Sequence, residues 1–164
     1  MSTAPAPVPP AAGAGLDDQL CFALYAASRA ATAAYREPLD RLGLTYTQYV
    51  VLLALWDRDA RTVSELGEAL HLDSGTLSPL LTRMAAADLV ERRRDSADAR
   101  QVTVHLTDHG RGLRERVGAL QRRLFAAVDM DADELATLRT LARRFCEAAA
   151  RPLPDTPTDL EGAR

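Results

Sequence analysis

Two kinds of hydrophobic periodicity follow one another between residues 72 and 107. In the first half, apolar residues recur at the spacing of one helix face: Leu77, Leu80, Leu81 and Met84. Asp73 stands before them as an N-cap. In the second half, apolar and polar residues alternate as in strands, around Leu89 and Val90 and again at Val102, Val104 and Leu106. With a polar, turn-prone segment between the strands (residues 92–101), the pattern predicts a helix followed by a two-stranded hairpin.

Three helices are predicted before this region. The first runs from Leu16 to about Tyr35 and has an apolar face made by Leu20, Leu24, Ala27 and Ala31. Pro38 and Gly43 then indicate a connector. Residues 45–48 (TYTQ) form a capping-box pattern, and the almost wholly apolar residues 49–56 predict a core helix. Residues 62–65 (TVSE) repeat the capping pattern and open a short helix that ends near Leu70, the first half of a helix-turn-helix.

Two more helices are predicted after the hairpin. Thr107 caps a long helix from Gly110 to about Val128, and residues 131–134 (DADE) cap a last helix that ends near Ala150. Pro79 removes one backbone donor from the helix that follows Asp73, so we expect a distorted first turn there.

These elements predict a mainly α-helical fold with a small β-wing, that is, a winged helix-turn-helix. We expect Pro-rich disordered tails at residues 1–15 and 151–164 and a single domain at 16–150. The winged helix-turn-helix covers about residues 46–107. The helices at about 16–36 and 108–150 exceed what so small a domain needs to cover itself, so we expect them to form a homodimer. A two-fold dimer would address a palindromic site with half-sites about 34 Å apart.

Composition changes this picture little. The chain has 164 residues, enough for one domain, and its net charge of −3 means that any DNA-binding surface must be local. No apolar run reaches transmembrane length and no secretory signal precedes the first helix, so we expect a cytoplasmic protein without membrane contact. Two cysteines in such a protein argue against a structural disulfide.

The helix after Asp73 and the hairpin carry the candidate DNA contacts. The polar face of the helix consists of Ser74, Thr76, Ser78, Thr82 and Arg83. It fits a helix in the major groove, although an ordinary solvated face has the same pattern. Among residues 92–94 only Arg92 and Arg94 share a side of the strand, where they are either phosphate contacts or solubility charges. In the hairpin turn we expect Asp98 to pair with a neighbouring arginine, which leaves Arg100 to enter the minor groove.

Several of these motifs resemble the MarR family of bacterial transcription regulators. They are DSGTLSPLLTRM (73–84), ERRR (91–94), DAR (98–100) and HLTDHG (105–110). Two upstream stretches, LDDQLCFALYAASRA (16–30) and LTYTQYVVLLALW (44–56), resemble the OhrR-type organic-peroxide sensors within that family. The resemblance covers roughly residues 16–150. It implies a dimeric DNA-binding repressor without a cofactor.

Cys21 is the candidate for reactive chemistry. From the residues alone it is either a small hydrophobe on a buried helix face or a thiol with Tyr25 one turn away on the same face. The resemblance implies the second interpretation, because in OhrR-type sensors this thiol bonds to tyrosines at the positions of Tyr35 and Tyr46 from the partner subunit. Within one helix Tyr35 lies about 21 Å from Cys21, too far for contact.

The resemblance also implies the chemistry of sensing. The Cys21 thiolate attacks an organic hydroperoxide and becomes a sulfenic acid, after which the operator is released. An apolar pocket at Phe22, Leu24 and Trp56 would favour organic hydroperoxides over hydrogen peroxide. Cys146 is a candidate second redox cysteine, but we expect it to serve packing, since the family's second cysteine is expected nearer residues 124–128. A low-molecular-weight thiol would then cap the oxidised Cys21.

The sequence leaves one main alternative open and disfavours two others. A MarR-type regulator released by a small aromatic or anionic ligand, without thiol chemistry, is the main one. A peroxide-consuming thiol enzyme is disfavoured because the α/β pattern of thioredoxin-like peroxidases is missing. A metal-sensing regulator is disfavoured because His105 and His109 straddle the predicted end of a strand and start of a helix, without a supporting cluster of ligands.

Overall fold

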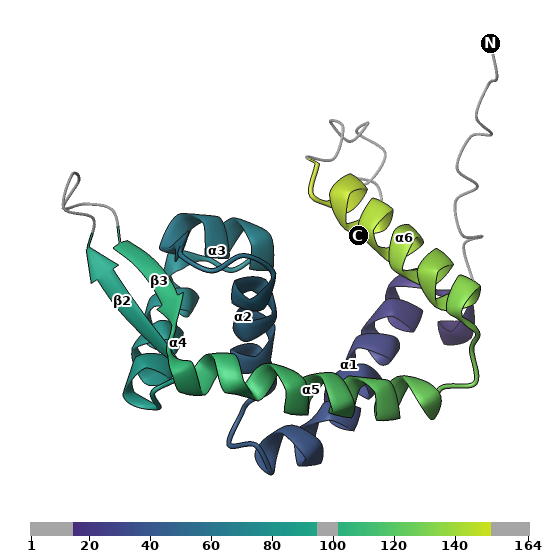
Figure 1. The fold of residues 1–164 in the computed structure, drawn as a ribbon. Helices are drawn as coiled ribbons and strands as arrows, with labels where there is room; N and C mark the ends of the chain where they lie inside the picture. The colour runs from purple at the N-terminus through teal and green to yellow at the C-terminus, as the bar shows by residue number, and fades with distance from the viewer. Residues whose placement is uncertain (1–14, 95–101, 152–164) are drawn as a thin grey trace. The chain divides into compact units, whose positions relative to one another are not determined.

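The computed structural model describes residues 15–94 and 102–151 (Figure 1). The chain divides into two compact units, one ending at Leu124 and the other beginning at Phe125. The first contains a short 3-10 turn, η1 (Leu16–Asp18), and the helices α1 (Leu20–Asp40), α2 (Tyr46–Asp57), α3 (Val63–Leu70), α4 (Ser74–Ala86) and most of α5 (Asp108–Ala126). It also contains the strands β1 (Arg61–Thr62), β2 (Val90–Arg94) and β3 (Val102–Leu106). The second unit contains α6 (Ala132–Ala149). The predicted fold class, mainly α with a small β-wing, is confirmed.

The helix starts follow the capping signals in the sequence. Capping boxes are present at Thr45, Thr62 and Asp131, in each case with the glutamine or glutamate three residues later. At the second box, hydrogen bonding from the Thr62 backbone N–H and the Arg58 guanidinium lowers the pKa of Glu65 to about 2. Asp73 accepts a hydrogen bond from the Thr76 N–H at 2.8 Å, which fixes the start of α4.

The sheet has three antiparallel strands in the order β1-β3-β2. Strands β2 and β3 form the predicted hairpin, with Val90 opposite Leu106 and Arg92 opposite Val104. Strand β1 was not predicted, because its two residues are too few to show an alternating pattern. It pairs with β3 through Arg61 and Val104 and so joins the wing to the start of α3.

One hydrophobic core lies under the helix-turn-helix and the sheet. Its fully buried side chains come from the end of α1 and the connector after it, from α2, α3 and α4, from β2 and β3, and from the first half of α5: Leu39, Leu44, Val51, Leu52, Leu55, Leu66, Leu77, Leu81, Met84, Val90, Val104 and Val117. The apolar stripe predicted for α4 is entirely buried in this core. The stripe therefore orients the opposite face of α4 toward solvent.

Three predicted details of the helices were wrong. Residues 16–18 form a separate turn, so the first long helix begins at Leu20 rather than Leu16. Pro38 does not start a connector, because α1 continues to Asp40, and the burial of Leu39 holds the turn that the proline weakens. The first turn of α4 is regular despite Pro79, since Asp73 supplies both its capping side chain and the carbonyl that accepts from the Leu77 N–H at 2.9 Å.

Candidate functional site

The outer face of α4 presents the short polar side chains expected for DNA contact. Ser74, Thr76, Thr82 and Arg83 are exposed, and Ser78 is half-buried. Two of the hydroxyls already donate within the helix, that of Thr76 to Asp73 at 3.1 Å and that of Thr82 to the Ser78 carbonyl at 3.0 Å. Ser74 and Arg83 make no such side-chain bond to a described residue and are the groups most available to a base edge or phosphate.

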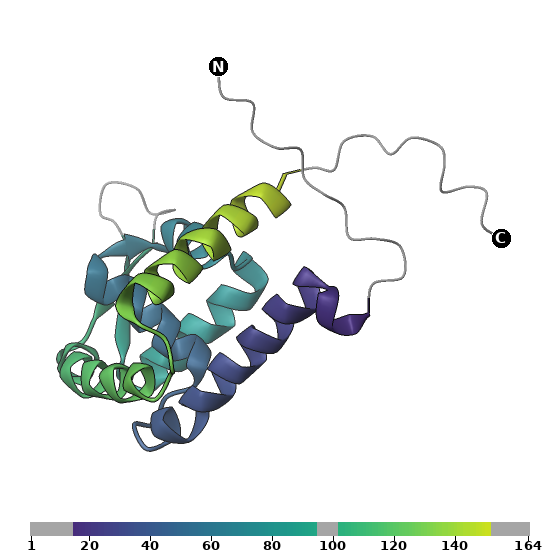
Figure 2. The same cartoon turned by 90° about the vertical axis from the view of Figure 1, so that its right-hand side faces the viewer.

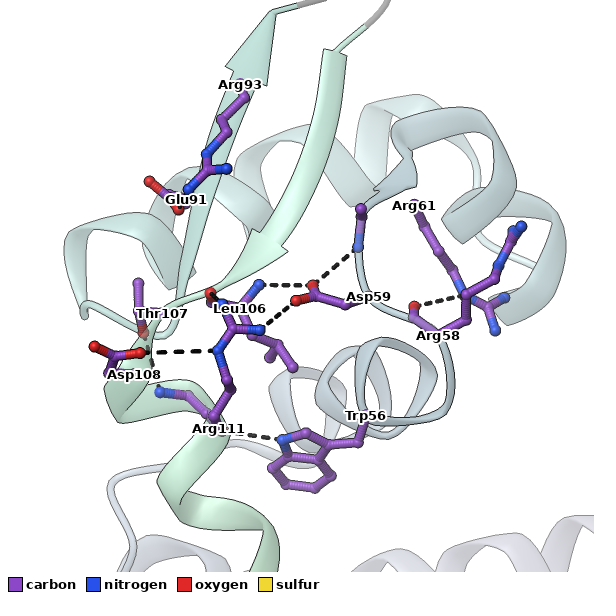
Figure 3. Close-up of polar contacts among 12 residues, drawn as sticks. Trp56, Arg58, Asp59, Arg61, Glu91, Arg93, Leu106, Thr107, Asp108 and Arg111 are labelled. Carbon is purple, nitrogen blue, oxygen red and sulfur yellow. Dashed lines mark hydrogen bonds and ion pairs between the residues drawn. The ribbon is translucent and has the colours of Figure 1, made fainter.

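The three wing arginines differ in their surroundings. Arg93 is ion-paired with Glu91 on the same strand (Figure 3). Arg92 and Arg94 form no ion pair with a described residue and share the other side of β2, as predicted from the strand period. Asp98 and Arg100, predicted for the wing tip, lie outside the described residues.

A groove of about 640 Å³ separates the wing from the helix-turn-helix. Its walls are Ser64 and Glu68 on α3, Ser74 at the start of α4, and Arg92 and Val102 on the sheet, with other residues of these elements. The groove thus brings two predicted DNA contacts, Ser74 and Arg92, to one surface, although they lie on different elements.

The start of α5 is fastened to the loop after α2 by an ionic network (Figure 3). Asp59 accepts hydrogen bonds from the Leu106 and Ala60 N–H groups, both at 2.9 Å, and is paired with the Arg111 guanidinium. Arg111 also donates to the Leu106 carbonyl at 2.7 Å. Burial acts to raise the pKa of Asp59, but the two backbone N–H groups and Arg111 outweigh it, so the pKa lies below its ordinary value.

The helix-turn-helix and the sheet, residues 44–107, are called the reading head below. Further contacts hold the start of α5 against this reading head. The indole N–H of Trp56 donates to the Gly110 carbonyl at 3.0 Å. The Thr107 hydroxyl donates to the Asp88 carbonyl at 2.5 Å and accepts from the Gly110 N–H at 3.0 Å.

A Cβ on Gly110 would lie 2.1 Å from the Leu89 carbonyl oxygen, so only glycine permits this close approach of α5 to the backbone of Leu89. Trp56 therefore belongs to the junction between α5 and the reading head. Its predicted place in a peroxide pocket with Phe22 and Leu24 is not supported by any contact among the described residues.

Tyrosines from α1 and α2 form a cluster. The ring of Tyr35 lies edge-on to that of Tyr46, with centroids 5.7 Å apart, and is stacked on that of Tyr49 at 5.1 Å. Tyr46 and Tyr49 are 5.7 Å apart. The Tyr49 hydroxyl accepts a hydrogen bond from the Gln121 amide of α5 at 2.8 Å. The structure thus brings the predicted Tyr35 and Tyr46 together and adds Tyr49, for which the sequence predicts only a place in the core helix.

The two phenols on α2, those of Tyr46 and Tyr49, have raised pKa values. Burial raises the pKa of Tyr49 well above its ordinary value, and a hydrogen bond with Tyr35 raises it further. Burial and then the proximity of Tyr35 raise the pKa of Tyr46. A protonated phenol can donate a hydrogen bond to an anion such as a thiolate.

Cys21 lies in the first turn of α1 and is exposed in the single chain. Tyr25, one turn further on, is also exposed, and its hydroxyl accepts a hydrogen bond from Arg29 at 3.0 Å. Among the described residues of this chain no tyrosine is hydrogen-bonded to Cys21, so Cys21 and the tyrosine cluster are two separate parts of one chain.

Cys146 lies on α6 in the second unit. It is exposed in the single chain, so the packing role that we expected for it is not seen there. Phe145 beside it is half-buried, and Leu138 and Leu141 on the same helix are about half exposed. The helix therefore presents apolar side chains to its surroundings.

Comparison with known proteins places these features in a family. Residues 34–117 match the family model described as transcriptional regulator SarA/Rot. The chain is 48% identical over 137 residues to the HTH-type transcriptional regulator TtmR of Methylorubrum extorquens, which covers 83% of this chain and 70% of TtmR. It is 41% identical over 125 residues to the organic hydroperoxide resistance transcriptional regulator of Bacillus subtilis, with 76% and 85% covered.

Solved structures give the same result. Reduced AbfR bound to DNA matches with a TM-score of 0.70 and 32% identity, covering 82% of this chain and 92% of AbfR. MarR matches with a TM-score of 0.65 and 26% identity, covering 81% and 98%. The family model and both relatives above are described as transcriptional regulators and not as enzymes, in agreement with the sequence prediction. Within the described residues no helix has the length and apolar character needed to span a bilayer.

Proposed function

Because the chain belongs to the MarR-type family of winged-helix transcriptional regulators, we propose that it is a cytoplasmic homodimeric repressor that binds a palindromic operator in double-stranded DNA. We further propose that oxidation of Cys21 by organic hydroperoxides releases the operator. The pairing of Tyr35 with Tyr46 on the same chain that carries an exposed Cys21 is the observation that supports the redox part. The organic hydroperoxide regulator among the relatives is consistent with it.

The first half of α1 supports the proposed dimer. Figure 2 shows these N-terminal turns (purple) extending away from α3. Leu20 is 58% exposed and Tyr25 is 56% exposed, and Leu16 before the helix is exposed as well. Apolar side chains gathered in this way are normally covered by a partner. A second copy of the chain would cover them, and its Tyr35 and Tyr46 would supply the phenol donors that Cys21 does not find in its own chain.

The proposed reaction is a two-electron oxidation of sulfur. The Cys21 thiolate attacks one oxygen of the hydroperoxide, an S–O bond forms and the O–O bond breaks. The alkoxide that leaves takes up a proton to become an alcohol, and Cys21 becomes a sulfenic acid. Sulfur is oxidised and the peroxide is reduced. The additional oxygen changes the geometry in which the partner's phenols can hydrogen-bond to the thiol group.

The proposed DNA contacts combine α4 and the wing. Ser74 and Arg83 would face the major groove, with Thr76, Ser78 and Thr82 along the same helix, and Arg92 or Arg94 would contact phosphates. Asp98 and Arg100 remain predictions for the wing tip. The matched variants Arg92→Ala and Arg93→Ala test the wing, because Arg93 is already paired with Glu91. Because the dimer carries two copies of each residue, we expect Arg92→Ala to reduce the slope of log affinity against log salt by about 2, one for each lost phosphate contact, and Arg93→Ala to change it little.

Operator binding during peroxide titration tests the sensor. We expect the reduced protein to release its operator when one equivalent of cumene hydroperoxide is added, and dithiothreitol to restore binding. Cys21→Ser should stay bound. If wild type and Cys21→Ser both remain bound, thiol sensing is excluded, and release by a small aromatic or anionic ligand becomes the leading mechanism.

Cys146→Ser separates two versions of the proposal. If oxidised Cys21 is capped by a low-molecular-weight thiol, Cys146→Ser responds to peroxide as wild type does, and mass spectrometry finds the added thiol on Cys21. If Cys146 is a resolving partner, the variant stops at the sulfenic acid and no disulfide between the two cysteines is formed.

A further inference from the structure

Tyr49 is the only member of the tyrosine cluster for which the structure records a hydrogen bond to α5 within the described residues. It is 3% exposed, its ring stacks on that of Tyr35 at 5.1 Å, and its hydroxyl accepts from the Gln121 amide at 2.8 Å. A continuous series of contacts therefore leads from α1 through α2 to α5: the ring of Tyr35 stacks on that of Tyr49, and Tyr49 is hydrogen-bonded to Gln121.

Helix α5 extends this path to the reading head. Gln121 and Arg111 lie ten residues apart on the helix, about 15 Å along its axis. At the near end, Arg111 is bound to Asp59 and to the Leu106 carbonyl at the foot of the wing. Next to it, Gly110 packs against the backbone of Leu89 so closely that no side chain fits between them. A rigid helix attached at both ends transmits a displacement of one end to the other.

The cluster and the junction are attached to α5 by different kinds of contact. At the junction an ion pair and several hydrogen bonds hold α5 to α2, to the loop after it and to the foot of the wing. At the cluster, one neutral hydrogen bond and ring packing connect α5 to Tyr35. Loss of the weaker attachment would therefore leave the junction of α5 with the reading head intact, while Tyr35 and Tyr49 lost their connection to α5.

We propose that Tyr49 and Gln121 form the positioning relay that couples the state of the Tyr35 and Tyr46 pair to the reading head. This inference rests on the proposed function, since Tyr35 is taken to contact the partner's Cys21. Tyr49 does not contact the thiol in this scheme. When oxidation displaces Tyr35, the stacked Tyr49 moves with it, its bond to Gln121 shifts α5, and the half-sites lose their spacing.

Tyr49→Phe and Gln121→Leu test the relay by removing opposite ends of one hydrogen bond. For each protein three quantities are measured: the operator Kd of the reduced form, the rate of Cys21 oxidation by cumene hydroperoxide, and the operator Kd after complete oxidation. We expect the first two to stay within about twofold of wild type, because the ring stack and the thiol are kept. We expect the ratio of oxidised to reduced Kd to fall about fivefold in each variant, the effect of one hydrogen bond.

The double variant identifies the shared bond. If Tyr49 and Gln121 act through one interaction, the Kd ratio of the double variant falls no further than that of either single variant. Additive losses, or unchanged ratios in both single variants while wild type responds to peroxide, would overturn the relay. If wild type itself keeps its operator after Cys21 is oxidised, the proposed function fails instead. Gln121 is only half-buried, so Gln121→Leu gives a folded test protein even if Tyr49→Phe disturbs the core.

Discussion

Helix α4 and the first half of α1 have the same kind of apolar stripe but different surroundings. In α4 the four stripe residues are 0–4% exposed, because α2, α3 and the sheet cover them within the same chain. In α1, Leu20 at the start of the stripe is 58% exposed and Leu24 is half-buried, whereas Leu39 at the other end of the helix is buried. A hydrophobic pattern thus shows that a face must be covered, but not which chain covers it.

The difference corresponds to the two tasks of the proposed regulator. The reading head is complete in one chain, with a buried core, capped helices and a polar junction to α5. The first half of α1, which holds Cys21, leaves apolar side chains exposed in the single chain. A sensor whose thiol lies where two copies meet could change the arrangement of the copies without unfolding either reading head.

The largest effect on stability is expected for Leu81→Ala. Leu81 is completely buried, so its truncation leaves a cavity and should reduce the free energy of unfolding by about 3 kcal/mol. Denaturant titration measures this loss, which should persist at every protein concentration. A loss below about 1 kcal/mol would mean that the core under α4 is not closed in the single chain.

A smaller loss is expected for Gly110→Ala at the junction. The new Cβ would meet the Leu89 carbonyl at 2.1 Å, so α5 and the wing must separate, at a cost of about 2 kcal/mol. Gly112→Ala is the matched control on the same helix, because a Cβ there meets nothing within 4 Å. The control should stabilise α5 by about 0.5–1 kcal/mol, measured by the same titration. Equal effects of the two substitutions would contradict the close approach of α5 to Leu89.

Asp59→Asn should cost about 1.5 kcal/mol at pH 7, since a charge-assisted network is lost. The pKa of Asp59 is lowered by folding, so its stabilisation is present above the ordinary value of 3.8 and is lost as the pH falls through the folded value. The difference between wild type and variant should therefore shrink below about pH 4. Asp57→Asn, at a carboxylate that is 79% exposed and paired with Arg61, should have little effect at any pH. A pH-independent difference at Asp59 would assign its role to packing.

The smallest effect on folding, and a selective effect on assembly, is expected for Leu20→Ala. The side chain is mostly exposed in the single chain, so the reading head should keep its structure and its circular dichroism spectrum. If a second copy covers Leu20, the dimer dissociation constant measured by sedimentation should rise roughly tenfold, which corresponds to about 1.4 kcal/mol. An unchanged dissociation constant would exclude this part of α1 from the dimer interface.

Much of the fold could be predicted from the sequence because its signals are local. The N-caps at Thr45, Thr62, Asp73 and Asp131 fixed four helix starts, and alternation fixed the hairpin. Strand β1 was missed because two residues carry no period, and Pro38 was misjudged because the burial of Leu39 outweighs the lost backbone donor.

The candidate site could be predicted only in part. Resemblance pointed to Cys21, Tyr35 and Tyr46, and the structure brings the two tyrosines together. Tyr49 looked like one more core residue in an apolar stretch, and nothing local links it to Gln121, which lies 72 residues away. Asp59 and Arg111 are 52 residues apart and were likewise not predicted.

The sequence by itself determined the types of the longer elements, the four helix starts with N-caps and the exposed polar face of α4, because caps and periodicity act over a few residues. Tertiary structure alone decided that Trp56 bonds to Gly110, that Tyr49 joins the tyrosines to α5, and that Arg111 fastens α5 to the wing. These contacts join segments far apart in the chain, and they form only where burial of the shared core brings the segments within hydrogen-bonding distance.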